Sequence, residues 1–480
     1  MKPTTRVVVS FLCLFSFALI NNSIHASGNQ PDAGVASAPR TMRVDYYHTG
    51  NSKQEWFSLD RVVLEPLQWP GDLEKSIDES QLGNYRFEVR DKRGGKLLYS
   101  RGFNSVFGEW SSIEEAQRVN RTFSESLRFP SPGGPVEISL EERKEGRFQE
   151  VWKTTVDPKD KFVDSSRPPS PGALLELQMM GPPSEKVDLL LLGDGYTAKE
   201  RGKFESDARR YMETLFSISP FREHRKDFNV WGLCPAAEES GISRPSSGIY
   251  RRSPLGTTYD TFGIERYVLT TENRALRDVA SFAPYEFVEI LVNGATYGGG
   301  GIFNQYATVA IDNHWASYVG VHEFGHQFAA LADEYYTSEV AYLPPEIRTE
   351  PWEPNVTALL DPTILKWKDL VEPGTPIPTP WDKDEFDRFE RGIQQQRTEL
   401  RAAGKPEAEM DELFRKERER EDEMLSSQKF AGKVGAFEGA NYESKGYYRP
   451  EVNCIMFTRH NAFCKVCRRA IDRVIRMYAK

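Results

Sequence analysis

Two histidines and a glutamate stand close together in the segment His322-Glu323-Phe324-Gly325-His326. Histidines four residues apart lie on one face of a helix, so both imidazoles can bind a single Zn²⁺ ion. The glutamate between them would lie beside the open coordination position. There it can take a proton from water and later give one to a leaving amine. The segment therefore predicts one catalytic zinc ion, with Glu323 as general base and acid.

A catalytic zinc ion needs a third protein ligand, and none of the other histidines follows His326 at a short spacing. In a straight helix Asp333 would lie about 10 Å beyond His326 along the axis, too far to share the ion. Asp333 can bind only if the helix breaks near 329–331 and the chain turns back. We favour Asp333, with Glu334 or a remote carboxylate such as Glu438 as alternatives. Three ligands leave one position open for water, as in catalytic sites.

A methionine lies far downstream, in Cys454-Ile455-Met456. If Met456 packs beneath the two histidines, its thioether gives them a soft, apolar floor. The plain alternative is a methionine of the ordinary hydrophobic core.

The N-terminus has the pattern of a secretory signal. Lys2 and Arg6 precede an apolar run from Val7 to Ile20, and Ile24-His25-Ala26 suits cleavage after Ala26. The run is too short for a comfortable membrane span, and no later segment is apolar enough. We expect a mature chain that is secreted, periplasmic or displayed at the cell surface.

Four cysteines remain after such cleavage: Cys234, Cys454, Cys464 and Cys467. An even number in an exported chain favours two disulfides, whose pairing the sequence does not give. Cys464 and Cys467 form a single Cys-x-x-Cys, which is half of a zinc site or a redox pair. Because no second such pair exists, disulfides are the favoured interpretation.

The chain has 480 residues and a net charge of −9, which argues against a nucleic-acid partner or an anionic membrane surface. After the signal, a Gly/Ala/Ser/Pro-rich stretch, 27–40, predicts a disordered spacer. Alternating apolar and polar residues over 41–160 predict an antiparallel β-sandwich. A Pro/Ser-rich linker over 161–183 leads to a catalytic domain over 184–480.

The catalytic domain changes the pattern. Continuous apolar runs predict buried strands, and helical spacing over 198–216 falls between two of them, which indicates a mostly parallel sheet covered by helices. These runs are 187–192, 228–233 and 287–292. Residues 306–311, between four glycines and the histidine helix, predict an edge strand that could pair with an extended substrate.

A highly charged segment, 382–424, is broken by Gly404-Lys405-Pro406 and predicts two helices. A solvated surface insertion is the favoured interpretation, with a docking arm as the alternative. If it buries little apolar surface, its removal should leave the rest folded and active.

The histidine segment with Leu331-Ala332-Asp333-Glu334-Tyr335 resembles the IgA-peptidase family of secreted bacterial metallopeptidases, the igazincins, which are relatives of the metzincins. The resemblance extends to 187–200, 297–301 and 437–440, then to 448–450 and 454–467, and to 43–50 and 108–110. It implies His322 and His326 as zinc ligands, Glu323 as base and Met456 as the Met-turn residue. The metzincin pattern places a glycine and then a histidine or aspartate where this chain has Ala329 and Ala332, and Asp333 follows one residue later.

The predicted molecule is therefore multidomain, with a β-sandwich followed by an α/β, metzincin-like zinc peptidase domain that cleaves an extended polypeptide. Two other functions are weighed against this. A surface-binding protein with a vestigial metal domain would not need the intact Glu323. A hydrolase of small molecules would need a deep, closed pocket. The sequence gives neither the substrate protein nor the oligomeric state.

Overall fold

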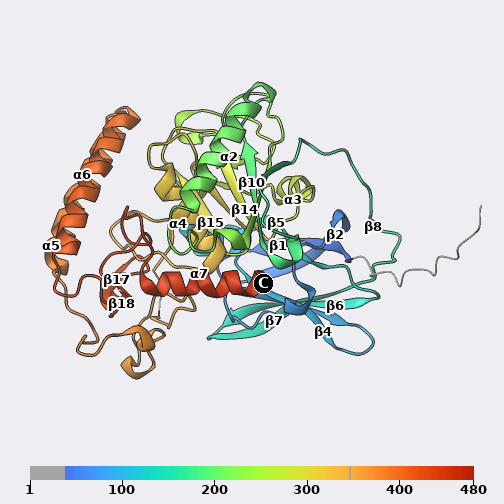
Figure 1. The fold of residues 1–480 in the computed structure, drawn as a ribbon, viewed down its shortest axis with the longest axis horizontal. Coiled ribbons are helices and arrows are strands. Elements are labelled where there is room, and N and C mark those ends of the chain that lie inside the picture. Colours follow the sequence, from blue (N-terminus) through green and yellow to red (C-terminus); the bar gives the residue numbers. More distant parts are fainter. Residues whose placement is uncertain (1–37, 345–346) are drawn as a thin grey trace, which may run out of the picture. The chain divides into compact units, whose positions relative to one another are not determined.

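The computed structural model describes residues 38–344 and 347–480. The predicted signal peptide, 1–26, and nearly all of the predicted spacer, 27–40, lie outside the described residues. Residues Pro39–Lys480 belong to a single unit, which Figure 1 draws as a ribbon.

The first part of this unit contains two four-stranded sheets with the strand orders β5-β1-β2-β8 and β4-β3-β6-β7. All neighbours are antiparallel except β2 and β8. Alternate residues of both sheets point into a shared core, such as Val44 and Tyr46 of β1 and Phe87 and Val89 of β3. The strands are β1 (Arg40–Gly50), β2 (Glu55–Gln68), β3 (Tyr85–Asp91), β4 (Leu97–Phe103), β5 (Arg121–Pro130), β6 (Val136–Lys144), β7 (Arg147–Val156) and β8 (Val163–Asp164).

The second part is built on a six-stranded sheet with the order β15-β16-β14-β10-β11-β9. Its four inner strands are parallel, and the two outer strands are antiparallel to their neighbours. The strands are β9 (Leu175–Gln178), β10 (Val187–Asp194), β11 (Phe228–Leu233), β14 (Phe287–Val292), β15 (Gly299–Ile302) and β16 (Tyr306–Ala310). The predicted strands therefore form, and the inner sheet is parallel as expected.

Both faces of this sheet are covered, which explains the unbroken apolar runs. In β10, Leu189 and Leu191 face the core shared with α2 (Arg201–Leu215), α4 (Ala316–Ala329) and α7 (Lys465–Tyr478). Leu190 and Leu192 face the other core, shared with α1 (Val106–Ser111) and α3 (Asn273–Ala280). The remaining elements are β12 (Thr257–Thr258), β13 (Leu269–Thr270), α5 (Lys383–Ala402), α6 (Glu407–Ser426), β17 (Phe437–Ala440) and β18 (Glu443–Arg449).

One prediction about the edge of the sheet is corrected. The predicted edge strand, 306–311, is an interior strand: β16 pairs with β14 on one side and with β15 on the other. The glycine-rich segment before it is the edge instead. Within the predicted linker, 161–183, β8 joins a sheet of the first part and β9 forms the other edge of the six-stranded sheet.

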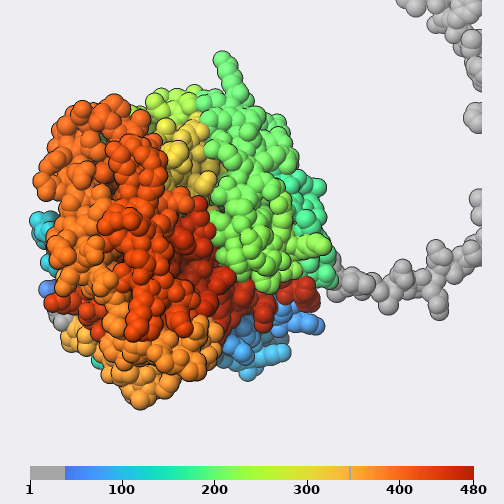
Figure 2. Space-filling model, turned by 60° about the vertical axis from the view of Figure 1, so that its left-hand side comes forward, coloured from blue at the N-terminus to red at the C-terminus, as the bar shows by residue number. Residues whose placement is uncertain are grey.

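The charged segment does form two helices, α5 and α6, with a break at Gly404, but the prediction of a solvated insertion is wrong. Phe386, Ile393, Met410 and Phe414 are each at most 5% exposed and belong to the same core as α4. We call these two helices the α5–α6 hairpin. In Figure 2 its orange residues adjoin yellow and red parts of the chain on one continuous face.

Within the described residues, every helix is too short or too polar to cross a lipid bilayer.

Candidate active site

The helix that carries the two histidines is held close to its neighbours by glycines. A side chain on Gly301 of β15 would strike the main-chain oxygen of Glu323, 2.3 Å from its first carbon. One on Gly320 would meet the ring of Tyr211 in α2 at 2.5 Å. Both contacts are closer than real side chains allow. The glycines therefore let the edge strand and α2 pack directly against α4.

The helix ends four residues before Asp333, the predicted third ligand. Ala330 follows the last helical residue with φ +55, in the left-handed region, so the chain reverses direction there. The reversal brings Asp333 back to the histidines, which confirms the predicted break. The metzincin pattern has its glycine at the position of Ala329. The left-handed residue of this chain, Ala330, lies one position later. The acidic residue is displaced by one position as well.

Three atoms converge at this point. The Nε2 atoms of His322 and His326 are 3.1 Å apart, and Oδ1 of Asp333 lies 3.0 and 3.2 Å from them. Two donors at the vertices of a tetrahedron around zinc would be about 3.3 Å apart. Asp333 is buried, and its Oδ1 accepts no hydrogen bond from any described residue. The three atoms therefore fit a metal ion.

Each histidine is oriented by its other nitrogen. Nδ1 of His322 donates to the carbonyl of Ile455 at 2.9 Å, and Nδ1 of His326 donates to the carbonyl of Leu331. With Nδ1 protonated, the lone pair of each ring is on Nε2, which faces Asp333. When the imidazoles are protonated instead, their charge and hydrogen bonds outweigh the effect of burial and hold the pKa of Asp333 far below its usual range.

The carboxylate of Glu323 lies on the open side of this group. It is partly exposed, and one of its oxygens is within 4.8 Å of the imidazole nitrogens. Burial raises the pKa of Glu323, and the imidazoles oppose part of that rise. Glu323 is thus placed to exchange protons with a molecule next to the three donor atoms.

The alternative third ligands lie elsewhere. The side chain of Glu334 points to three cysteines instead of the histidines, and its Oε1 accepts a hydrogen bond from Asn355 at 2.9 Å. Glu438, in β17, accepts a hydrogen bond from the main chain of Gly446. The same Asn355 bonds to both main-chain groups of Ala332 and so fixes the segment that carries Asp333.

Tyr442 is a site residue that the sequence did not reveal. Its hydroxyl donates to Oδ2 of Asp333 at 2.6 Å. Asn441 and Tyr442 join β17 to β18 with positive φ angles of 54 and 65, unusual for a tyrosine. The amide of Asn441 also bonds to the carbonyl of Asp333. Only the asparagine, which favours such turns, marks this position in the sequence.

Met456 packs against the helix that carries the two histidines. It is fully buried in a turn in which the amide of Phe457 donates to the carbonyl of Cys454. A methyl group on Gly325, between Glu323 and His326, would lie 3.2 Å from the Met456 sulfur and 3.2 Å from the ring of Phe463. Gly325 thus allows α4 to pack on this turn.

This contact makes a testable prediction. We expect Gly325→Ala to lower the free energy of unfolding by about 1–3 kcal/mol, because overpacking outweighs the gain in helix propensity. The matched control is Gly392→Ala in α5, where nothing lies within 4 Å and alanine should add about 0.5–1 kcal/mol. Denaturant titration of both metal-free variants measures the difference. Equal stabilisation by the two alanines would contradict the close packing on Met456.

The prediction of disulfides is also corrected. All four cysteines are free, and three of them lie together in the core, apart from Cys234.

Family comparisons agree with the resemblance seen in the sequence. The family model described as IgA Peptidase M64 matches residues 175–475, and that of the Peptidase M64 N-terminus matches residues 35–153. The chain belongs to the M64 family of IgA peptidases. A search of curated proteins gave no match. Membership identifies the chain as a peptidase, and the M64 match spans every residue of the candidate site.

Proposed function

We propose that this M64 peptidase is an exported, zinc-dependent endopeptidase, with a β-sandwich in front of a metzincin-like catalytic domain. The observation that carries the proposal is the triangle of donor atoms from His322, His326 and Asp333, with Glu323 beside it. Two imidazoles and a carboxylate suit Zn²⁺ and leave a position open. The signal-like pattern of residues 1–26 supports export.

A zinc ion held by these three residues would act as a Lewis acid toward water and the scissile carbonyl. The protein's own groups do the rest. Glu323 takes a proton from the attacking water and returns it to the leaving amine. Tyr442 and the carbonyls of Leu331 and Ile455 keep the ligands oriented. Met456 fills the space below the histidines, the role of a Met-turn.

The substrate would lie in a cleft of about 1190 Å³ that opens over these residues. The glycine strand β15 borders it, and so do Asn104, Glu109 and Arg143 from the first part of the chain. We infer that the N-terminal part helps to bind the substrate, which favours a peptidase over a binding protein with a vestigial metal domain.

The edge of β15 offers main-chain groups to an extended peptide. Gly299 already bonds to the carbonyl of Arg266 and the amide of Val268, and the carbonyl of Phe303 accepts from Asn104. Gly301 lies between them with the same orientation as Gly299. On this side it has no main-chain partner among the described residues.

We expect a peptidic inhibitor to run antiparallel to β15 and to exchange hydrogen bonds with Gly301. A crystal structure of the complex measures this. Methylating the inhibitor amide that faces Gly301 should weaken binding, whereas methylating its neighbour should not. A bound inhibitor without contacts to this strand would refute the pairing.

A further prediction concerns Tyr442. Phenylalanine removes the hydroxyl that bonds to Asp333, so we expect Tyr442→Phe to bind zinc about 10–100-fold more weakly, the usual effect of losing such a partner. Competition with a chelator measures the affinity, and Tyr250→Phe, at a side chain that is 74% exposed, is the control. Unchanged zinc affinity would exclude Tyr442 from a role in metal binding.

The experiment that tests the proposed function is cleavage profiling of a peptide library by the purified protein. Activity should be lost when a chelator removes the metal and return with stoichiometric Zn²⁺. Activity that survives complete metal removal would overturn the zinc mechanism. Binding of polypeptides without any cleavage by the zinc-loaded protein would favour the vestigial alternative.

A further inference from the structure

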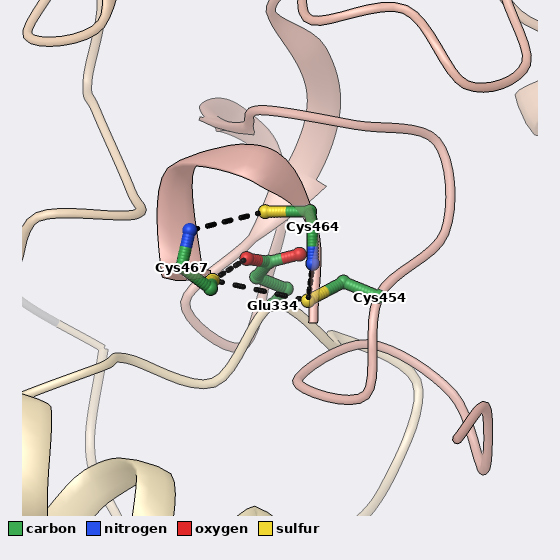
Figure 3. A group of neighbouring side chains, drawn as sticks. All are labelled: Glu334, Cys454, Cys464 and Cys467. Atoms are coloured by element: carbon green, nitrogen blue, oxygen red, sulfur yellow. Dashed lines mark hydrogen bonds between the residues drawn. The ribbon is translucent and has the colours of Figure 1, made fainter. Parts of the chain in front are cut away.

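A second group of metal-binding side chains lies behind the active site. Cys454, Cys464, Cys467 and Glu334 are each at most 4% exposed, and one ligand atom from each lies within 4.8 Å of the other three. Figure 3 shows the three sulfurs and the carboxylate turned toward one another. They come from three places in the chain: the segment after α4, the turn before Met456, and the start of α7.

The spacing of the sulfurs fits one ion. The Sγ atoms of Cys454 and Cys467 are 3.8 Å apart. Two thiolates on a tetrahedral zinc ion, each about 2.3 Å from the metal, are separated by about 3.8 Å. A disulfide would bring them to about 2.05 Å and would leave the third cysteine unpaired.

The surrounding amides stabilise negative sulfur. The amide of Cys464 donates to Sγ of Cys454 at 3.3 Å, and the amide of Cys467 donates to Sγ of Cys464 at 3.4 Å. Cys464 caps α7, whose N-terminal dipole favours thiolates.

Glu334 supplies an independent indication of a cation. Its side chain is fully buried, and Oε2 has no hydrogen-bond partner among the described residues. The nearby Arg449 does not satisfy it, because its guanidinium donates to the carbonyls of Gly439 and Val452. A buried carboxylate oxygen without a partner is costly, and a metal ion between it and the sulfurs would remove that cost.

We propose that Cys454, Cys464, Cys467 and Glu334 bind a second, structural Zn²⁺ ion, distinct from the ion proposed at His322, His326 and Asp333. Soft thiolates select zinc over magnesium or calcium. Four protein donors leave no position for a substrate, which is the arrangement of structural sites. On binding, the thiol protons pass to solvent.

This ion would support the catalytic residues from behind. Glu334 directly follows Asp333, and its amide donates to the carbonyl of Met456 at 2.8 Å. Cys454 precedes Ile455, whose carbonyl orients His322. One ion would thus connect the segment that carries Asp333, the turn that contains Met456, and helix α7. The proposal depends on the cluster alone and holds whether or not the first site is catalytic.

The test is metal analysis of the full-length protein. Wild type should carry two equivalents of zinc. The pair Cys464→Ser and Cys467→Ser should lower this to one, and so should His322→Ala with His326→Ala. Cys234→Ser, outside the cluster, should keep two. After cobalt substitution, sulfur-to-metal charge-transfer absorption should persist in the histidine variant and vanish in the cysteine variant.

If the cysteine variant fails to fold, wild type and the histidine variant still show whether zinc binds at the cysteines. X-ray absorption at the zinc edge of the histidine variant should show a shell of three sulfurs near 2.3 Å and one oxygen near 2.0 Å. A histidine variant without zinc, a zinc shell without sulfur in that variant, or a disulfide among the three cysteines would each overturn the proposal.

Discussion

Replacing Glu323 by glutamine should leave a folded, zinc-loaded protein that no longer cleaves peptides. The amide has the size of the carboxylate but cannot take a proton from the attacking water. General acid–base assistance is worth roughly 10² to 10⁴ in rate, so we expect kcat to fall by that factor with little change in KM. The side chain lies beside the three donor atoms without being one of them, so metal content should stay the same.

The controls separate chemistry from structure. Zinc content and thermal unfolding of Glu323→Gln should match wild type, and cleavage profiling should give no products above background. The matched control is Glu205→Gln in α2, at a side chain that is 42% exposed, and this variant should keep full activity. Near-wild-type cleavage by Glu323→Gln would exclude Glu323 as the base.

Deleting the α5–α6 hairpin should abolish folding, the reverse of what the charge pattern suggested. The hairpin buries at least five large apolar side chains in the core that contains α4: Phe386, Ile393, Met410, Phe414 and Leu425. Burial of each contributes about 1.5–3 kcal/mol, so their loss is comparable with the whole stability of a domain, about 5–15 kcal/mol. Soluble expression and circular dichroism measure the outcome.

The deletion would also leave a buried charge without its partner. Arg459 bonds to Glu417 at 2.7 Å and lies over the ring of Phe414 at 3.8 Å. As a milder variant, Phe414→Ala should cost about 3–5 kcal/mol. Arg415→Ala, on the exposed side of α6, should be nearly neutral. A folded, active deletion protein would show that this core is not needed.

The charge pattern of the α5–α6 hairpin is misleading because charged residues stand among the apolar residues of its buried face. Glu390, Glu417 and Glu421 are at most 4% exposed and share the helix faces with the apolar residues. They interrupt the helical period that marks a buried face. The pairing of Glu417 with Arg459, which comes from a distant part of the chain, is visible only in the folded structure.

The sheet was predictable for a simple reason. Its inner strands are buried on both faces, so runs such as 228–233 and 287–292 contain almost nothing but apolar residues and coincide with β11 and β14. Residues 306–311 are equally apolar, but the pattern does not tell which neighbours pair with a strand. Glycines contribute no hydrophobic signal, so β15, the real edge, was hidden.

In the site, local spacing located His322, Glu323 and His326, and the need for a chain reversal located Asp333. Local spacing could not reveal contacts between segments that are distant in the sequence. Tyr442 lies 109 residues after Asp333. Glu334 and Cys467 are 133 residues apart, so no further ligand stood near the lone Cys-x-x-Cys, and two disulfides were favoured over a zinc site.

The bond between His322 and the carbonyl of Ile455 spans 133 residues. A ribosome synthesises the chain from its N-terminus, so the helix that carries the histidines emerges long before the segment that orients the first of them. During that interval His322 lacks the carbonyl of Ile455, and Met456 is not yet packed against α4. The order of synthesis thus delays assembly of the active site, which is complete only after nearly all of the polypeptide has emerged. A copy whose synthesis has not yet reached Ile455 therefore cannot hold its first histidine in place.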